Sequence, residues 1–239
     1  MLKRELEYFF GAIRFFTRLP VPAWVGHSAE ALNHSARYFP AVGLLVGGIG
    51  ALVYLSAALL WPKSVAVLLS MVATIYATGA FHEDGLSDTV DGLGGGWEKL
   101  RILEIMKDSR VGSYGVVAMV LALLGKFTLL SALDEALIPF ALLAGHAFSR
   151  FCSTLLLATM DYVREDLLAK AKPLATRLTP GALLVATTFA VFPLFFFTAQ
   201  QCSNWRVPRC TCHLLVCPIV QALAGWLYRR LSGGDAASQ

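Results

Sequence analysis

FPAVGLLVGGIGALVYLSAALLW, residues 39–61, runs for 23 residues without a charged side chain. A helix needs about 20 mostly apolar residues to cross the hydrocarbon core of a bilayer. Inside that core only helices and closed barrels satisfy every backbone N–H and C=O group. The segment therefore predicts a transmembrane helix.

The rest of the chain repeats this pattern. Further spans are predicted near residues 64–81, 111–133, 136–160, 178–205 and 210–228. Hydrophobic residues make up 56 % of the 239 residues and charged residues only 15 %, which argues against a soluble protein. We expect an all-α fold: one integral-membrane domain over residues 1–239, a polytopic helix bundle with about six transmembrane helices.

Lysine and arginine residues orient these spans. With a cytoplasmic N-terminus, 15 of the 20 basic residues fall in inside segments and three fall outside, and cytoplasmic loops are the basic ones in membrane proteins. The two long inside segments, 82–110 and 161–177, place the working surface on the cytoplasmic face. The N-terminus carries no cleavable signal pattern, and Leu6–Phe16 is expected to lie in the membrane interface as an amphipathic helix.

The segment 81–96, FHEDGLSDTVDGLGGG, holds the densest group of acidic residues. If the second span continues as a helix past the membrane surface, Asp84, Asp88 and Asp91 share one face at i, i+4 and i+7. Carboxylates so close together favour a divalent cation, and Mg²⁺ commonly bridges one or two of them to phosphate. The glycines at 92 and 94–96 are expected to end the helix and to let backbone N–H groups approach an anion.

A second polar group follows within the predicted amphipathic helix 97–108 and just beyond it. Glu104 and Asp108 are spaced i, i+4, and Lys107 and Arg110 supply cations that could face phosphate. These four are candidate substrate-binding residues. The alternative is that they only solvate a helix face.

Four other residues that can carry charge each have a separate interpretation. Arg150 lies inside a predicted span, where a charge is costly and indicates function. Lys126, also inside a span, could reach the outer interface and receives no role. His82 could be a ligand, a base or a surface residue. Lys172 could bind phosphate or only set topology.

Six motifs together resemble the cobalamin synthase family, also called adenosylcobinamide-GDP ribazoletransferase. They are FTRLPVP at 16–22, FHEDGLSDTVDGLGGG at 81–96, LEIMKDSRVGSYG at 103–115, Ser149-Arg150, YVRE at 162–165 and AKPLA at 171–175. The two central motifs are long and ordered, and the resemblance runs through most of the chain.

The resemblance implies an Mg²⁺-dependent enzyme of the bacterial inner membrane. It would join adenosylcobinamide-GDP to α-ribazole, or to its 5′-phosphate, and release GMP in the last assembly step of the cobalamin nucleotide loop. A set of metal ligands is then expected from Asp84, Asp88 and Asp91 with Glu83, and phosphate contacts from Arg110, Arg150 and Lys172. An aspartate of this set or His82 would accept the hydroxyl proton.

The expected partners are these small molecules and membrane lipid, without nucleic acid; a homo-oligomer is compatible with the sequence. Residues 202–239 depart from the family pattern, because a Gly-Thr-Gly-Asp type motif and a further apolar segment do not follow Arg230. A frameshift or truncated reading frame is one hypothesis for this difference. The rival functions are a CDP-alcohol-type membrane phosphotransferase and an anion transporter.

Overall fold

A computed structural model describes residues 2–26, 28–159 and 178–203. The described residues form helices and no strands, which confirms the expected all-α fold. The elements in chain order are α1 (Leu2–Phe16), α2 (Ala29–Ser35), the 3₁₀ turn η1 (Ala36–Tyr38), α3 (Phe39–Ala58), α4 (Lys63–Thr78), α5 (Phe81–Gly95), α6 (Lys99–Ile105), α7 (Ser113–Ala132), the 3₁₀ turn η2 (Glu135–Leu137), α8 (Ile138–Thr159) and α9 (Pro180–Ser203).

Three helical segments of the described chain are long and apolar enough to cross a membrane. They are Glu30–Ala58, Ser113–Ala132 and Glu135–Thr159, and the bent pair α4–α5 makes up to four. α9, at Pro180–Ser203, coincides with the predicted span 178–205. The predicted span at 210–228 lies outside the described residues. The chain is thus a polytopic helical membrane protein, as expected.

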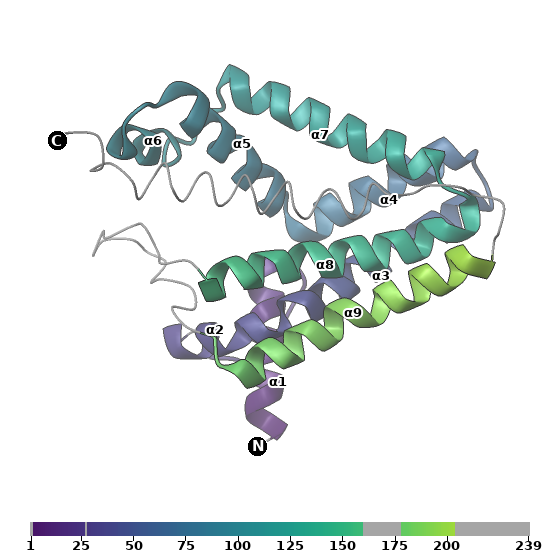
Figure 1. Cartoon of the computed structure of the whole chain (residues 1–239), viewed down its shortest axis with the longest axis horizontal. Helices are drawn as coiled ribbons and strands as arrows, with labels where there is room; N and C mark the ends of the chain where they lie inside the picture. Colours follow the sequence, from purple (N-terminus) through teal and green to yellow (C-terminus); the bar gives the residue numbers. More distant parts are fainter. Residues whose placement is uncertain (1, 27, 160–177, 204–239) are drawn as a thin grey trace.

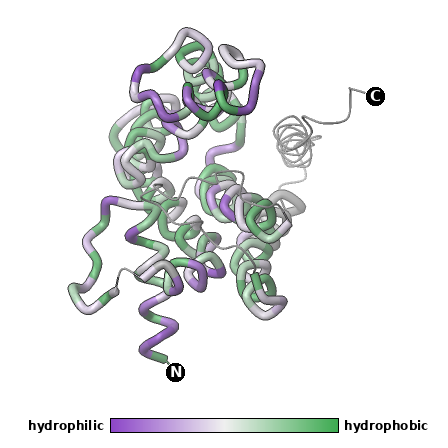
Figure 2. Tube along the Cα trace, turned by 90° about the vertical axis from the view of Figure 1, so that its left-hand side faces the viewer, coloured by the Kyte–Doolittle hydropathy of each residue, from purple (hydrophilic) through white to green (hydrophobic). Residues whose placement is uncertain are grey.

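The outward face of α7 is apolar. Its exposed side chains include Val116, Val117, Val120, Leu121 and Leu124, each at least half accessible. A contiguous apolar surface of this kind is unfavourable in water and suits contact with lipid. Figure 2 shows the same division along the trace: hydrophobic residues dominate the long helices, and hydrophilic residues gather in the loops at the α5–α6 end and near the N-terminus.

α3, α8 and α9 lie side by side, and α7 runs apart from them on the far side of α4 and α5 (Figure 1). Glycines bring α3 and α8 into backbone contact. A Cβ added to Gly47 would lie 2.7 Å from the carbonyl oxygen of Leu142, and one added to Gly43 would collide with the backbone at His146. Small residues are how membrane helices approach closely, since apolar burial alone does not drive helix association in lipid.

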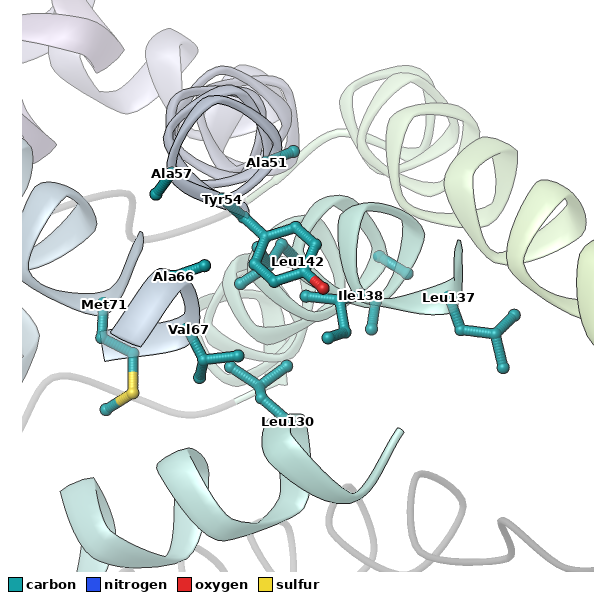
Figure 3. Close-up of a cluster of buried hydrophobic side chains, with 12 residues drawn as sticks. Ala51, Tyr54, Ala57, Ala66, Val67, Met71, Leu130, Leu137, Ile138 and Leu142 are labelled. Carbon is teal, nitrogen blue, oxygen red and sulfur yellow. The ribbon is translucent and has the colours of Figure 1, made fainter. Parts of the chain in front are cut away.

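A hydrophobic core joins α3, α4, α7 and α8. Tyr54, Val67, Leu130 and Ile138 converge from these four helices, as Figure 3 shows. A second core packs Phe16 of α1, with its neighbours, against Phe39 and Val42 of α3. The C-terminal half of α1 is therefore packed against protein, whereas Leu2 and Leu6 near its start are exposed.

α4 and α5 meet at a sharp corner. Gly79 (φ 64°) and Ala80 (φ 59°) both adopt the left-handed conformation, and the two helix axes differ by 84°. The side chain of Arg18 packs against Gly79, and the Arg18 backbone N–H donates to Ala77 O at 2.9 Å. The second span therefore does not continue straight into the acidic segment: the acidic residues occupy a separate helix that begins after the corner.

Candidate active site

α5 presents its three aspartates to three different environments. Asp84 is exposed, Asp88 is half-buried and Asp91 is only 8 % exposed. Their spacing does place them within three turns of one helix, as predicted. The described residues nevertheless contain no group of three or more acidic, histidine or cysteine side chains arranged to hold a metal ion. The predicted set of four carboxylate ligands is therefore not assembled as a cluster.

Asp91 caps the N-terminus of α7. Its Oδ2 accepts a hydrogen bond from the Gly112 backbone N–H, and its Oδ1 accepts one from the Gly115 N–H, both at 2.8 Å. The first N–H groups of a helix have no partner within the helix, and a carboxylate there also interacts favourably with the helix dipole. Both oxygens of Asp91 are thus used to hold α7 against α5, which differs from the ligand role expected from the sequence.

The glycines at the end of α5 allow close packing of neighbouring segments. A Cβ added to Gly92 would lie 2.6 Å from the side chain of Met106, and one added to Gly94 would lie 2.7 Å from the ring of Tyr114. The helix also continues through both residues and ends at Gly95. The helix thus ends within the predicted glycine run, and Gly92 and Gly94 face protein side chains.

Asp108 and Arg110 form a tight ion pair in the loop between α6 and α7. Arg110 Nη2 donates to Asp108 Oδ2 at 2.6 Å, and Arg110 Nε donates to both carboxylate oxygens at 3.0 Å. These hydrogen bonds lower the pKa of Asp108 from 3.8 to about 2 and raise the pKa of Arg110. The guanidinium is 88 % exposed, so the pair stands at the surface and not in the protein interior.

The remaining predicted polar residues near α6 are solvent-facing. α6 covers only Lys99–Ile105, shorter than the predicted helix 97–108. Glu104 is exposed and pairs with Arg101 at 2.7 Å across three residues, a contact that contributes little to stability. Lys107 is also exposed. Lys172 lies outside the described residues.

Arg150 belongs to a buried polar group that the sequence did not assemble. Its side chain is 2 % exposed on α8, and Nη1 donates to the carbonyl oxygen of His146 at 3.1 Å. The guanidinium also lies 5.6 Å from the centre of the Phe16 ring, and His82 stacks on the same ring at 5.4 Å. Phe16 therefore links α1, α5 and α8.

Glu83 Oε2 and Arg150 Nε are both buried without a hydrogen-bond partner among the described residues, and Glu83 forms no ion pair within 4.0 Å with Lys126 or Arg150 there. We call Glu83, Lys126, His146 and Arg150 the corner cluster, since Glu83 follows directly on the α4–α5 corner. Sequence reasoning missed His146 and left Lys126 without a role. The signals were present: His146 precedes Arg150 by one helical turn, and Lys126 is charged within a span.

Two surfaces of α5 thus carry chemistry. Asp84 and Asp88 face outward or partly outward, beside a loop fixed by the Asp91 cap, whereas Glu83 Oε2 is buried. Carboxylates next to arginine and lysine are the side chains that phosphate transfer requires, because the reacting group is highly anionic.

Comparison with known families decides between the candidate chemistries. The family model described as cobalamin-5-phosphate synthase matches residues 8–236. This chain belongs to the cobalamin-5-phosphate synthase family. The matched region includes most of residues 202–239, where the sequence departs from the expected family motifs.

Curated relatives in this family carry the name adenosylcobinamide-GDP ribazoletransferase. A relative from Shewanella woodyi is 48 % identical over 82 % of this chain and 77 % of its own length. One from Shewanella frigidimarina is 43 % identical over 97 % of this chain and 84 % of its own. One from Vibrio cholerae is 40 % identical over 98 % of this chain and 87 % of its own. No solved structure matches this chain.

Proposed function

We propose that this chain is an adenosylcobinamide-GDP ribazoletransferase, which carries out the last step in assembling the cobalamin nucleotide loop. The observation that carries this proposal is the family match over residues 8–236, together with relatives of that name at 40–54 % identity. The two rival functions, a CDP-alcohol phosphotransferase and an anion transporter, do not account for this family match.

In the proposed reaction, a ribose hydroxyl of α-ribazole, or of its 5′-phosphate, attacks the phosphorus on the cobinamide side of the diphosphate. A new P–O bond forms, the P–O bond to GMP breaks, and GMP leaves with the electron pair. The hydroxyl proton passes to a base of the protein. Asp84, Asp88 and His82 remain candidates for this base. Asp91 is not retained, because both its oxygens accept backbone hydrogen bonds and its side chain is buried.

α5 fits Mg²⁺ only as an ion whose other ligands come from the substrate and from water. Asp84 and Asp88 lie one turn apart on α5 and supply the hard oxygen ligands that Mg²⁺ prefers. Mg²⁺ typically binds one or two carboxylates and completes its shell with water and phosphate oxygens, so a cage of three protein ligands is unnecessary. Such an ion would neutralise charge on the diphosphate. Glu83 is not retained as a ligand, because its Oε2 is buried.

The loop between α6 and α7 supplies the proposed phosphate contact outside the corner cluster. Arg110 uses Nε and Nη2 to hold Asp108, so its Nη1 edge is the one that would meet a phosphate oxygen. The Asp91 cap fixes the start of α7 two residues beyond Arg110. The pairing with Asp108 restricts the arginine to one orientation and lowers the entropy lost on binding.

We place this site on the cytoplasmic face of the bacterial inner membrane. Support comes from the basic residues, 15 of which fall in segments that this orientation puts inside. A large corrinoid substrate made in the cytoplasm would then reach α5 from that side.

A product assay on membranes that contain this chain tests the proposal. Adenosylcobinamide-GDP, α-ribazole and Mg²⁺ should give a cobalamin and GMP in equal amounts, and EDTA should stop the reaction. The Asp88→Ala variant should insert normally but lose turnover, and the matched Glu98→Gln variant, an exposed carboxylate at the start of α6, should keep it. Product formation without GMP release, or normal turnover in Asp88→Ala, would contradict the assignment.

A further inference from the structure

A groove beside the start of α1 is lined mainly by apolar side chains, and we call it the α1 groove. Its volume is about 390 Å³, and it is lined by Leu2, Leu6 and Phe9 of α1 together with Leu44 of α3 and Phe189 of α9. The three side chains of α1 are spaced i, i+4 and i+7, so they share one face of the helix. Leu2 is 75 % exposed and Leu6 is 42 % exposed, so the described chain leaves this apolar face partly uncovered.

Glu5 is the charged side chain among the described residues that line the groove, and both its oxygens have partners. Oε1 lies 3.4 Å from Arg37 Nη1, and Oε2 accepts a hydrogen bond from the Tyr38 hydroxyl at 2.8 Å. A carboxylate that is paired in this way does not need a cation or a donor from a ligand. The interior of the α1 groove therefore suits an apolar occupant.

The position of the α1 groove in the bilayer identifies this occupant. Ala41 and Leu44 lie in the first turns of α3, within a helical segment long enough to span the membrane, and the basic residues place this end of the span inside. A hollow between spans at this depth meets lipid acyl chains and not water. Lys3 and Arg4 follow Leu2 and are exposed, so cations adjoin the groove near the membrane surface, where lipid phosphates attract them.

We propose that the α1 groove binds one acyl chain of a phospholipid from the cytoplasmic leaflet, with the lipid phosphate beside Lys3 and Arg4. Close packing against the groove and the contact with phosphate hold the lipid, since apolar burial alone drives no association inside a bilayer. The bound chain covers the exposed face at the start of α1. Because α1 ends at Phe16, whose ring contacts both His82 and Arg150, a lipid that fixes this helix also supports its other end at the candidate site.

Native mass spectrometry of the full chain tests this assignment after equilibration with phosphatidylglycerol in detergent. The wild type should keep one phospholipid per chain under activation that removes the detergent. Ala41→Phe places a ring in the groove and should weaken phospholipid affinity about 10-fold or more. Gly125→Phe is the matched control on α7, where nothing in the described chain lies within 4 Å of an added Cβ, and it should keep the lipid.

Leu6→Gln supplies a second variant in case Ala41→Phe does not fold, because the Leu6 side chain is already partly exposed. It should also lose the retained phospholipid. Its control is Leu184→Gln, which changes a side chain of α9 that is 68 % exposed and outside the groove, and it should retain the lipid. A wild type that retains no phospholipid, or the same retention in the wild type and in both groove variants, would overturn the proposal.

A second copy of this chain is the other apolar partner that could cover the α1 groove. The same spectra report the mass of the assembly and therefore distinguish the two occupants. If the wild type is a dimer that Ala41→Phe converts to monomers while phospholipid retention stays unchanged, the groove is a protein interface and the proposal fails.

Discussion

The carboxylate of Asp91, near the end of α5, accepts the backbone N–H of Gly115, in the first turn of α7, at 2.8 Å. With the matching bond to Gly112, this contact joins two helices across more than 20 residues of sequence. It fixes the loop that carries Asp108 and Arg110 beside the acidic helix. Asp91 therefore acts as a positioning residue for the candidate site.

Replacing Asp91 with asparagine should destabilise the protein. The amide oxygen can accept only one of the two N–H groups well, and the amide NH₂ would face the other donor, which costs about 1–3 kcal/mol. Unfolding in detergent should show this loss, and turnover should fall with it. Asp134→Asn, an exposed aspartate before η2, is the control and should unfold like the wild type. Unchanged stability in Asp91→Asn would contradict the cap.

Two glycines of α7 should respond in opposite directions to alanine. A Cβ on Gly115 would collide with the Asp91 carboxylate and Ser87 Oγ, so Gly115→Ala should lose about 1–3 kcal/mol of stability. Gly125 has nothing within 4 Å of its added Cβ in the described part of the chain. Gly125→Ala should gain about 0.5–1 kcal/mol, because alanine favours the helix. Thermal unfolding of both variants checks this, and changes of the same sign would rule the explanation out.

Gly79→Ala should disturb the corner that sets the direction of α5 relative to α4. Alanine costs about 1–2 kcal/mol in the left-handed conformation, and its Cβ would also collide with Arg18. The variant should lose stability and turnover together, because α5 would leave its present direction. Gly85→Ala, with no heavy atom within 4 Å of the added Cβ among the described residues, is the control within α5. Wild-type activity and stability in Gly79→Ala would show that the corner does not depend on this glycine.

The Asp108–Arg110 pair should persist far below neutral pH. Hydrogen bonds from Arg110 lower the pKa of Asp108 from 3.8 to about 2. A lowered folded pKa means that the pairing contributes to stability above about pH 4 and is lost as the pH falls from there to about 2. A ¹³C NMR titration of the Asp108 carboxyl group in detergent measures the midpoint. In Arg110→Gln the midpoint should return towards the ordinary value, and a midpoint near 4 in the wild type would contradict the pair.

Local sequence properties were sufficient for the fold class and for the position of the spans. Apolar segments such as residues 39–61 and 111–133 are helices in the structure, within a few residues of the predicted ends. Hydrophobic length is a property of consecutive residues, so it needs no knowledge of packing. The acidic segment and the mid-span Arg150 were found in the same way, because charge near or within apolar segments stands out. The roles predicted for these residues stay predictions.

Only the tertiary structure showed which residues of different helices contact one another. The left-handed Gly79 and Ala80 form an 84° corner against which Arg18 packs from elsewhere in the chain. Asp91 was predicted as a metal ligand because its spacing matches Asp84 and Asp88; its actual partners are N–H groups of another helix.

The sequence by itself determined a helical membrane protein of the cobalamin synthase type with its polar chemistry around residues 81–115, since composition and motif are read along the chain. Only the tertiary structure brought Arg150 to the ring of Phe16 and left atoms of His146 and Arg150 buried without partners among the described residues. The physical reason is distance: charge and hydrogen-bond energies depend on separation in space, and helix packing sets that separation for residues far apart in sequence.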